Sequence, residues 1–92
     1  MTDAARDAPK RRRQWREAGA IHVDVRGLPP PQPMVTILAL VESIRDATQI
    51  VVHHERDPVF LYPELAELGW VAARVEAPPG EVRLKLARRA ER

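Results

Sequence analysis

The chain has 92 residues, of which 30% are charged, and it contains no cysteine. This length allows one small domain with a modest core, and the lack of cysteine excludes disulfides, thiolate metal sites and thiol or persulfide catalysis. Its apolar runs are shorter than the roughly 20 residues that a membrane-spanning helix needs, and no apolar stretch follows the N-terminal charges as in a secretory signal. We therefore expect a cytoplasmic protein without a membrane partner.

Positive charge is concentrated at the start of the chain. Residues 1–18 carry six basic and three acidic side chains, whereas the remainder carries nine basic and ten acidic ones. Like charges in the run Lys10–Arg13 resist packing. We therefore expect residues 1–18 to form a disordered basic tail ahead of a domain over 19–88, with 89–92 frayed. Two alternatives for the tail are a phosphate-binding arm and docking of Trp15 on the domain.

The first predicted strand covers residues 21–26. Its odd-numbered residues are apolar and its even-numbered residues are polar, which indicates a half-buried strand. Gly27 and the prolines that follow it form a stiff, extended junction. Residues 34–45 then repeat apolar side chains at helical spacing, and Pro33 is suited to the first turn of that helix.

The sequence of the second half of the domain predicts three further strands and one helix. Residues 48–54 are rich in β-branched side chains, which favours a strand. An irregular turn over 59–62 precedes a short helix over 63–68, and a hairpin joins strands over 70–77 and 82–86. The elements predict an α+β fold: a two-layer α/β sandwich with the order β-α-β-α-β-β, in which two helices cover one face of a four-stranded mixed sheet.

Two adjacent histidines end the second predicted strand. Because neighbouring strand residues point to opposite faces, His53 and His54 cannot share one metal ion without a bulge. His22 on the first strand is a third candidate ligand, but the spacing lacks the HxxxH or HExxH pattern of a metal site. We therefore predict no metal site and keep His22, His53, His54 and Glu55 as weak candidates for one.

No catalytic constellation is visible in the sequence. The hydroxyl groups of Thr36, Ser43 and Thr48 lie within regular elements, without a nucleophile elbow or a glycine-rich loop. We therefore predict that the protein is not an enzyme and binds no cofactor.

The first junction carries the pattern Asp24-x-Arg26-Gly27-Leu28-x-x-Pro31-x-Pro33. This pattern resembles that of the SirA/TusA-like small bacterial sulfur carriers, whose first strand ends in D-x-R-G-L-x-C-P-x-P. The resemblance covers roughly residues 20–87 and implies the same β-α-β-α-β-β fold. In that family the cysteine of the motif carries a persulfide sulfur, and here its position is Pro30.

Proline at this position removes the sulfur-transfer chemistry that the family implies. The chain is similar to a cysteine-less branch of uncharacterised bacterial domains on the same scaffold. The segment Leu61-Tyr62-Pro63-Glu64-Leu65 and the turn over 54–58 add to this likeness. Domains of that branch occur beside or fused to hemerythrin-like and redox proteins, which implies a metal- or redox-linked role as an alternative.

We predict a non-enzymatic binding or accessory module. Both strand-to-helix junctions lie at the same edge of the predicted sheet, where helix N-terminal amides can hold an anion or a partner's carboxylate. We expect a protein partner or a small anionic ligand and leave the oligomeric state open. The first alternative is metal or cofactor binding through the three histidines; the second is nucleic-acid association through the tail, which the domain's charge does not favour. The predicted surface comprises Asp24, Arg26, Gly27, Pro30, Pro31, His54, Arg56 and Asp57.

Overall fold

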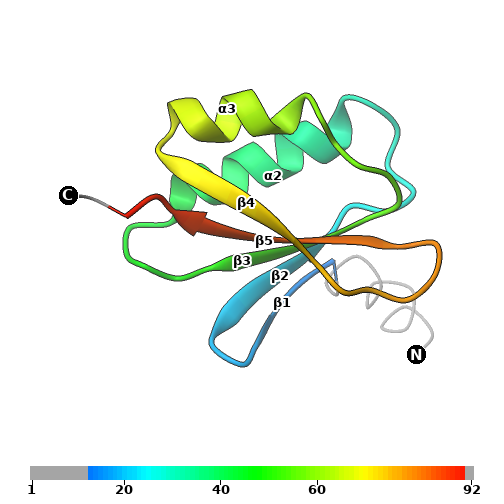
Figure 1. Cartoon of the computed structure of the whole chain (residues 1–92), viewed down its shortest axis with the longest axis horizontal. Helices are drawn as coiled ribbons and strands as arrows, with labels where there is room; N and C mark the ends of the chain where they lie inside the picture. Colours follow the sequence, from blue (N-terminus) through cyan, green and yellow to red (C-terminus); the bar gives the residue numbers. More distant parts are fainter. Residues whose placement is uncertain (1–12, 91–92) are drawn as a thin grey trace, which may run out of the picture.

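The computed structural model describes residues 13–90, which form five strands and two helices. The elements are β1 (Gln14–Glu17), β2 (Ala20–Asp24), α2 (Gln32–Ser43), β3 (Ile50–His54), α3 (Leu61–Glu67), β4 (Trp70–Val75) and β5 (Val82–Arg88). The sheet has the strand order β1-β2-β3-β5-β4. Only the β2–β3 pair is parallel in this sheet, and both helices lie on one side of it (Figure 1). Neither helix is long and apolar enough to cross a membrane.

The α+β class is confirmed, but the prediction of four strands in the order β-α-β-α-β-β is wrong. The additional strand β1 uses residues that the sequence analysis assigns to the tail, and it pairs antiparallel with β2. Ala18 and Gly19 join the two strands, and both have positive φ angles, as a tight hairpin turn matched to the strand twist requires. The rest of the predicted tail, residues 1–12, lies outside the described residues.

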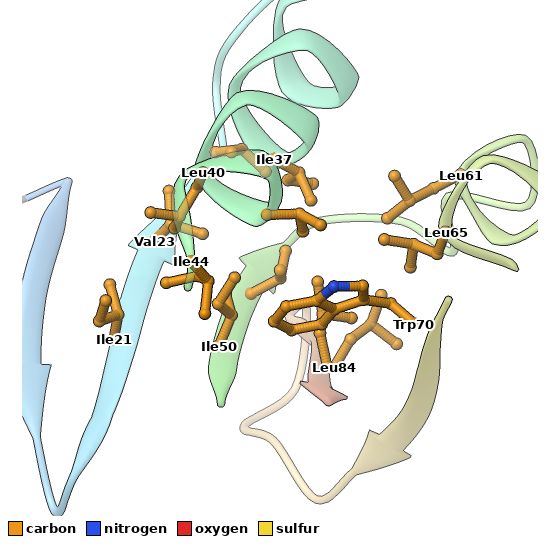
Figure 2. Close-up of a cluster of buried hydrophobic side chains, with 14 of the residues drawn as sticks. Ile21, Val23, Ile37, Leu40, Ile44, Ile50, Leu61, Leu65, Trp70 and Leu84 are labelled. Atoms are coloured by element: carbon orange, nitrogen blue, oxygen red, sulfur yellow. The ribbon is translucent and has the colours of Figure 1, made fainter. Parts of the chain in front are cut away.

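The core forms between the helices and the inner face of the sheet. The alternation predicted for residues 21–26 is confirmed in β2 and just beyond its end, because Ile21, Val23 and Val25 are buried while the residues between them are not. The predicted helical stripe of α2 is also confirmed at Ile37 and Val41, which are buried against the sheet. Figure 2 shows Ile37 of α2 in one cluster with Leu61 and Leu65 of α3 and with core side chains of the strands.

The second helix begins at Leu61, two residues before the predicted start at Pro63. Pro63 lies in its first turn, where a missing amide removes no intrahelical hydrogen bond. The predicted irregular turn over 59–62 is correspondingly shorter. In β4 it is Trp70 that faces the core, whereas Val71 lies on the exposed face.

Arg88, the last residue of β5, ties the sheet to the end of α2. Its guanidinium donates hydrogen bonds to the carbonyl oxygens of Ile44 (2.6 Å) and Asp46 (3.0 Å) and lies 5.3 Å from the centre of the Trp70 ring. A cation is favourable beside the unpaired carbonyls of a helix C-terminus. One side chain thus joins α2, β4 and β5.

Replacing Arg88 with methionine should lower the free energy of unfolding by about 1–3 kcal/mol, because two charge-assisted hydrogen bonds and the contact with Trp70 are lost. Urea denaturation measures the change. Arg45→Met is the matched control: Arg45 is exposed, so its replacement should change stability by no more than about 0.5 kcal/mol. Equal losses in the two variants would contradict the role of Arg88.

Candidate functional site

The two strand-to-helix junctions meet at one edge of the sheet. Parallel pairing places Asp24 opposite His53, so β2 and β3 end side by side and their following loops run together toward the helices (Figure 1). The Val25 amide donates to the His53 carbonyl (3.0 Å), and the Gly27 amide donates to Glu55 Oε1 (2.8 Å). These two bonds fix the loops to each other.

A cavity of about 380 Å³ lies between the start of α2 and the loop that joins β3 to α3. Its volume falls within the range of small ligand sites. At its rim Phe60 is 79% exposed and the neighbouring Val59 is 54% exposed, so an exposed apolar pair adjoins the cavity, and contiguous exposed apolar surface marks interaction sites. The wall is formed mainly by Leu28, Pro30, Pro31, Met34, Ile37 and Leu61.

His54 lines this cavity and is 5% exposed. Its Nδ1 accepts hydrogen bonds from the backbone amides of Glu55 (2.8 Å) and Arg56 (3.3 Å), and burial lowers its pKa. A neutral imidazole whose Nδ1 accepts must carry its proton on Nε2. Neither ring nitrogen therefore offers a lone pair to a metal ion.

The predicted surface is divided between the two sides of the sheet. Pro30, Pro31, His54, Arg56 and Asp57 all line the cavity, and Gly27 lies at the bond between the junctions.

Asp24 and Arg26 lie on the side of the sheet without helices. The Arg26 guanidinium donates to both Asp24 carboxylate oxygens (2.9 and 2.8 Å), and this pairing lowers the Asp24 pKa. The guanidinium of Arg26 and the carboxylate of Asp24 therefore pair with each other, and neither residue lines the cavity.

The open face of the sheet carries a polar cluster around His53. Its Nδ1 lies 2.6 Å from Glu81 Oε2, and its Nε2 lies 2.9 Å from His22 Nδ1. The Trp15 ring covers both imidazoles, with ring centres 5.2 Å apart in each case, as the docking alternative for Trp15 expects. Arg83 also donates to Glu81 (2.9 Å), and this bond lowers the carboxyl pKa.

The candidate metal ligands do not converge. His22 and His53 contact each other on the open face, whereas His54 lies on the opposite face and Glu55 accepts from Gly27. In residues 13–90, no three His, Cys, Asp or Glu side chains are grouped as a metal site requires.

Of the basic run Lys10–Arg13, only Arg13 lies within the described residues. Arg13 Nη1 donates to the carbonyl oxygens of Asp24 (2.9 Å) and Arg26 (3.1 Å). Its contacts therefore stabilise the end of β2.

Sequence reasoning missed Phe60 at the cavity rim and Glu81 in the polar cluster. The apolar pair Val59-Phe60 in a predicted turn was a usable signal, because turns rarely carry two large apolar residues. Glu81 gave no such signal, since its partner His53 is 28 residues away.

Comparison with known proteins identifies a family. A family model described as "Uncharacterized conserved protein (DUF2249)" matches residues 22–88, a span that begins within β2 and ends with β5. No curated protein matches the chain.

Stability should fall as the pH drops from about 7.5 to 5.5. Burial lowers the pKa of His22, with a further contribution from His53, and burial lowers that of His54. Near the ordinary histidine pKa of about 6.5, the unfolded chain therefore binds protons that the folded chain does not, and acid favours unfolding. Urea denaturation across this range should show less dependence on pH in His22→Gln and in His54→Gln than in the wild type.

The carboxyl groups of Asp24 and Glu81, whose pKa values are also lowered, lose their contribution only near and below their ordinary values of about 4. The pH range in which the histidines change the stability is therefore separate from that of the carboxyl groups. An unchanged slope between pH 7.5 and 5.5 in both variants would show that the imidazoles do not control it.

Proposed function

We propose that this chain, which belongs to the DUF2249 family, is a non-enzymatic binding module whose cavity receives an apolar side chain of a protein partner. The observation that carries the proposal is the cavity at the paired junctions, with the exposed Phe60 and Val59 at its rim.

The exposed rim favours a protein over a small molecule as the occupant. A small molecule inside a cavity of about 380 Å³ would leave most of Phe60 and Val59 in water. A protein surface would bury these side chains together with the cavity, and each large side chain removed from water stabilises a complex by about 1.5–3 kcal/mol. Aromatic residues at the centre of such a contact commonly dominate its energy.

The residues around the cavity support binding rather than catalysis. His54 Nδ1 is occupied by two backbone amides, Glu55 accepts from Gly27, and Asp57 accepts from the Tyr62 hydroxyl. These groups hold the loop in shape, and the described residues that line the cavity include no serine, threonine, cysteine or lysine.

The relation to sulfur-carrier scaffolds is part of the proposal. The position that carries the reactive cysteine in SirA/TusA-like proteins is Pro30 here, and Pro30 lines the cavity. On this view the module keeps a contact surface at the place where its relatives hold a thiol, and apolar contact replaces sulfur transfer.

Phe60→Ala should remove the partner from the protein purified under native conditions. Val71→Ala is the matched control, because Val71 is also an exposed apolar side chain but lies on β4, away from the cavity. We expect a partner that copurifies with the wild type and with the Val71 variant in equal amount. With that partner isolated, Phe60→Ala should weaken binding about 30-fold or more, as for a central aromatic contact.

Three results would contradict the proposal. They are the absence of any specific partner for the wild type, equal recovery with the Phe60 variant, and loss of the partner with the Val71 variant alone.

A further inference from the structure

We infer that the group entering this cavity carries a neutral amide carbonyl beside its apolar part, and that His54 Nε2 donates a hydrogen bond to that carbonyl. The inference rests on the proposed function, because it names the chemistry of the occupant at the same site.

His54 presents an unused donor to the cavity. Two backbone amides occupy Nδ1, so the proton of the neutral ring lies on Nε2. No hydrogen-bond partner of Nε2 is found in the described residues. Every fully buried side-chain nitrogen or oxygen in that part of the chain does have a partner, so Nε2 must keep some access to its surroundings. Because His54 lines the cavity and is 5% exposed, the cavity provides that access.

The donor persists at neutral pH. Burial is the main cause that lowers the His54 pKa. The charge of Glu55 raises this pKa, and the charge of Arg56 lowers it further. Protonation would also place a hydrogen on Nδ1, against the two amide hydrogens that this atom accepts. The ring therefore acts as a neutral donor with a fixed tautomer.

The start of α2 leaves one backbone amide without an acceptor. The Gln32 amide donates to the Pro29 carbonyl (2.8 Å) and the Val35 amide to the Pro31 carbonyl (3.1 Å), while Pro33 has no amide hydrogen. Met34, which lines the cavity, is thus the first-turn residue whose amide has no acceptor in the described residues. Such amides at helix starts need a partner from solvent or a ligand.

The charges of the lining favour a neutral acceptor over an anion. Glu55 and Asp57 each contribute a negative charge, and Arg56 contributes one positive charge. The start of α2 adds roughly half a positive charge, which leaves the site slightly negative. A carboxylate would meet this field unfavourably, whereas a carbonyl accepts the same hydrogen bond without carrying charge. The occupant is therefore better described as a peptide or side-chain amide than as the small anion that the sequence suggests.

Three probes with one aromatic body test the inference: phenylacetamide, phenylacetate and toluene. Each is titrated into the full-length protein at neutral pH and followed by amide and imidazole ¹⁵N–¹H NMR. We expect phenylacetamide to bind about fivefold or more tightly than either other probe, the gain typical of one buried hydrogen bond. We also expect phenylacetamide to shift the His54 Nε2 resonance. This measurement uses the wild-type protein and does not depend on the folding of a variant.

His54→Phe keeps an aromatic ring but removes the donor, so it should abolish the preference for phenylacetamide. Equal or tighter binding of phenylacetate or toluene, or binding of phenylacetamide that leaves the Nε2 resonance in place, would overturn the inference. Binding of all three probes with equal affinity, lost in Phe60→Ala, would leave the proposed function standing without the carbonyl. Failure of every probe to bind would count against both.

Discussion

The parallel pairing of β2 with β3 is the constraint on which both the cavity and the polar cluster around His53 depend. It places Asp24 opposite His53, so the two strands end at one edge and their junctions lie against each other. The bond from Gly27 to Glu55 then fixes the spacing of the loops, and the cavity forms between them. On the other side of the sheet the same pairing brings His22 into contact with His53.

The adjacent histidines show how one strand end serves two environments. Because neighbouring strand residues point to opposite faces, His54 faces the helices and the cavity, while His53 faces the open side beneath Trp15. His53 has a partner on each ring nitrogen and links Glu81 to His22, so it serves the structure of the open face. His54 uses only one ring nitrogen within the described fold, and the other is left for a ligand.

Local patterns in the sequence predict the α+β class, the alternation in β2 and the amphipathic face of α2. Strand β1 could not be predicted from a local pattern, because Gln14–Glu17 has only one large apolar side chain, Trp15. The ring of Trp15 packs on histidines from two other strands. Pro63 suggests a helix break, although in a first turn it causes none. The predicted surface mixes residues of both faces, because proximity to a strand end does not specify the direction of a side chain. The cavity, Phe60 and the free side of His54 depend on how the loop after β3 packs on α2, which no local pattern specifies.

The central claim is that the cavity between the junctions holds an apolar group together with a carbonyl. A crystal structure of the protein in complex with phenylacetamide tests it most directly. The account predicts the phenyl ring between Leu28, Ile37 and Leu61, with the carbonyl oxygen about 3 Å from His54 Nε2, the usual hydrogen-bond distance. A ligand ordered elsewhere on the protein, or a ring in the cavity with its carbonyl turned to solvent, would contradict it.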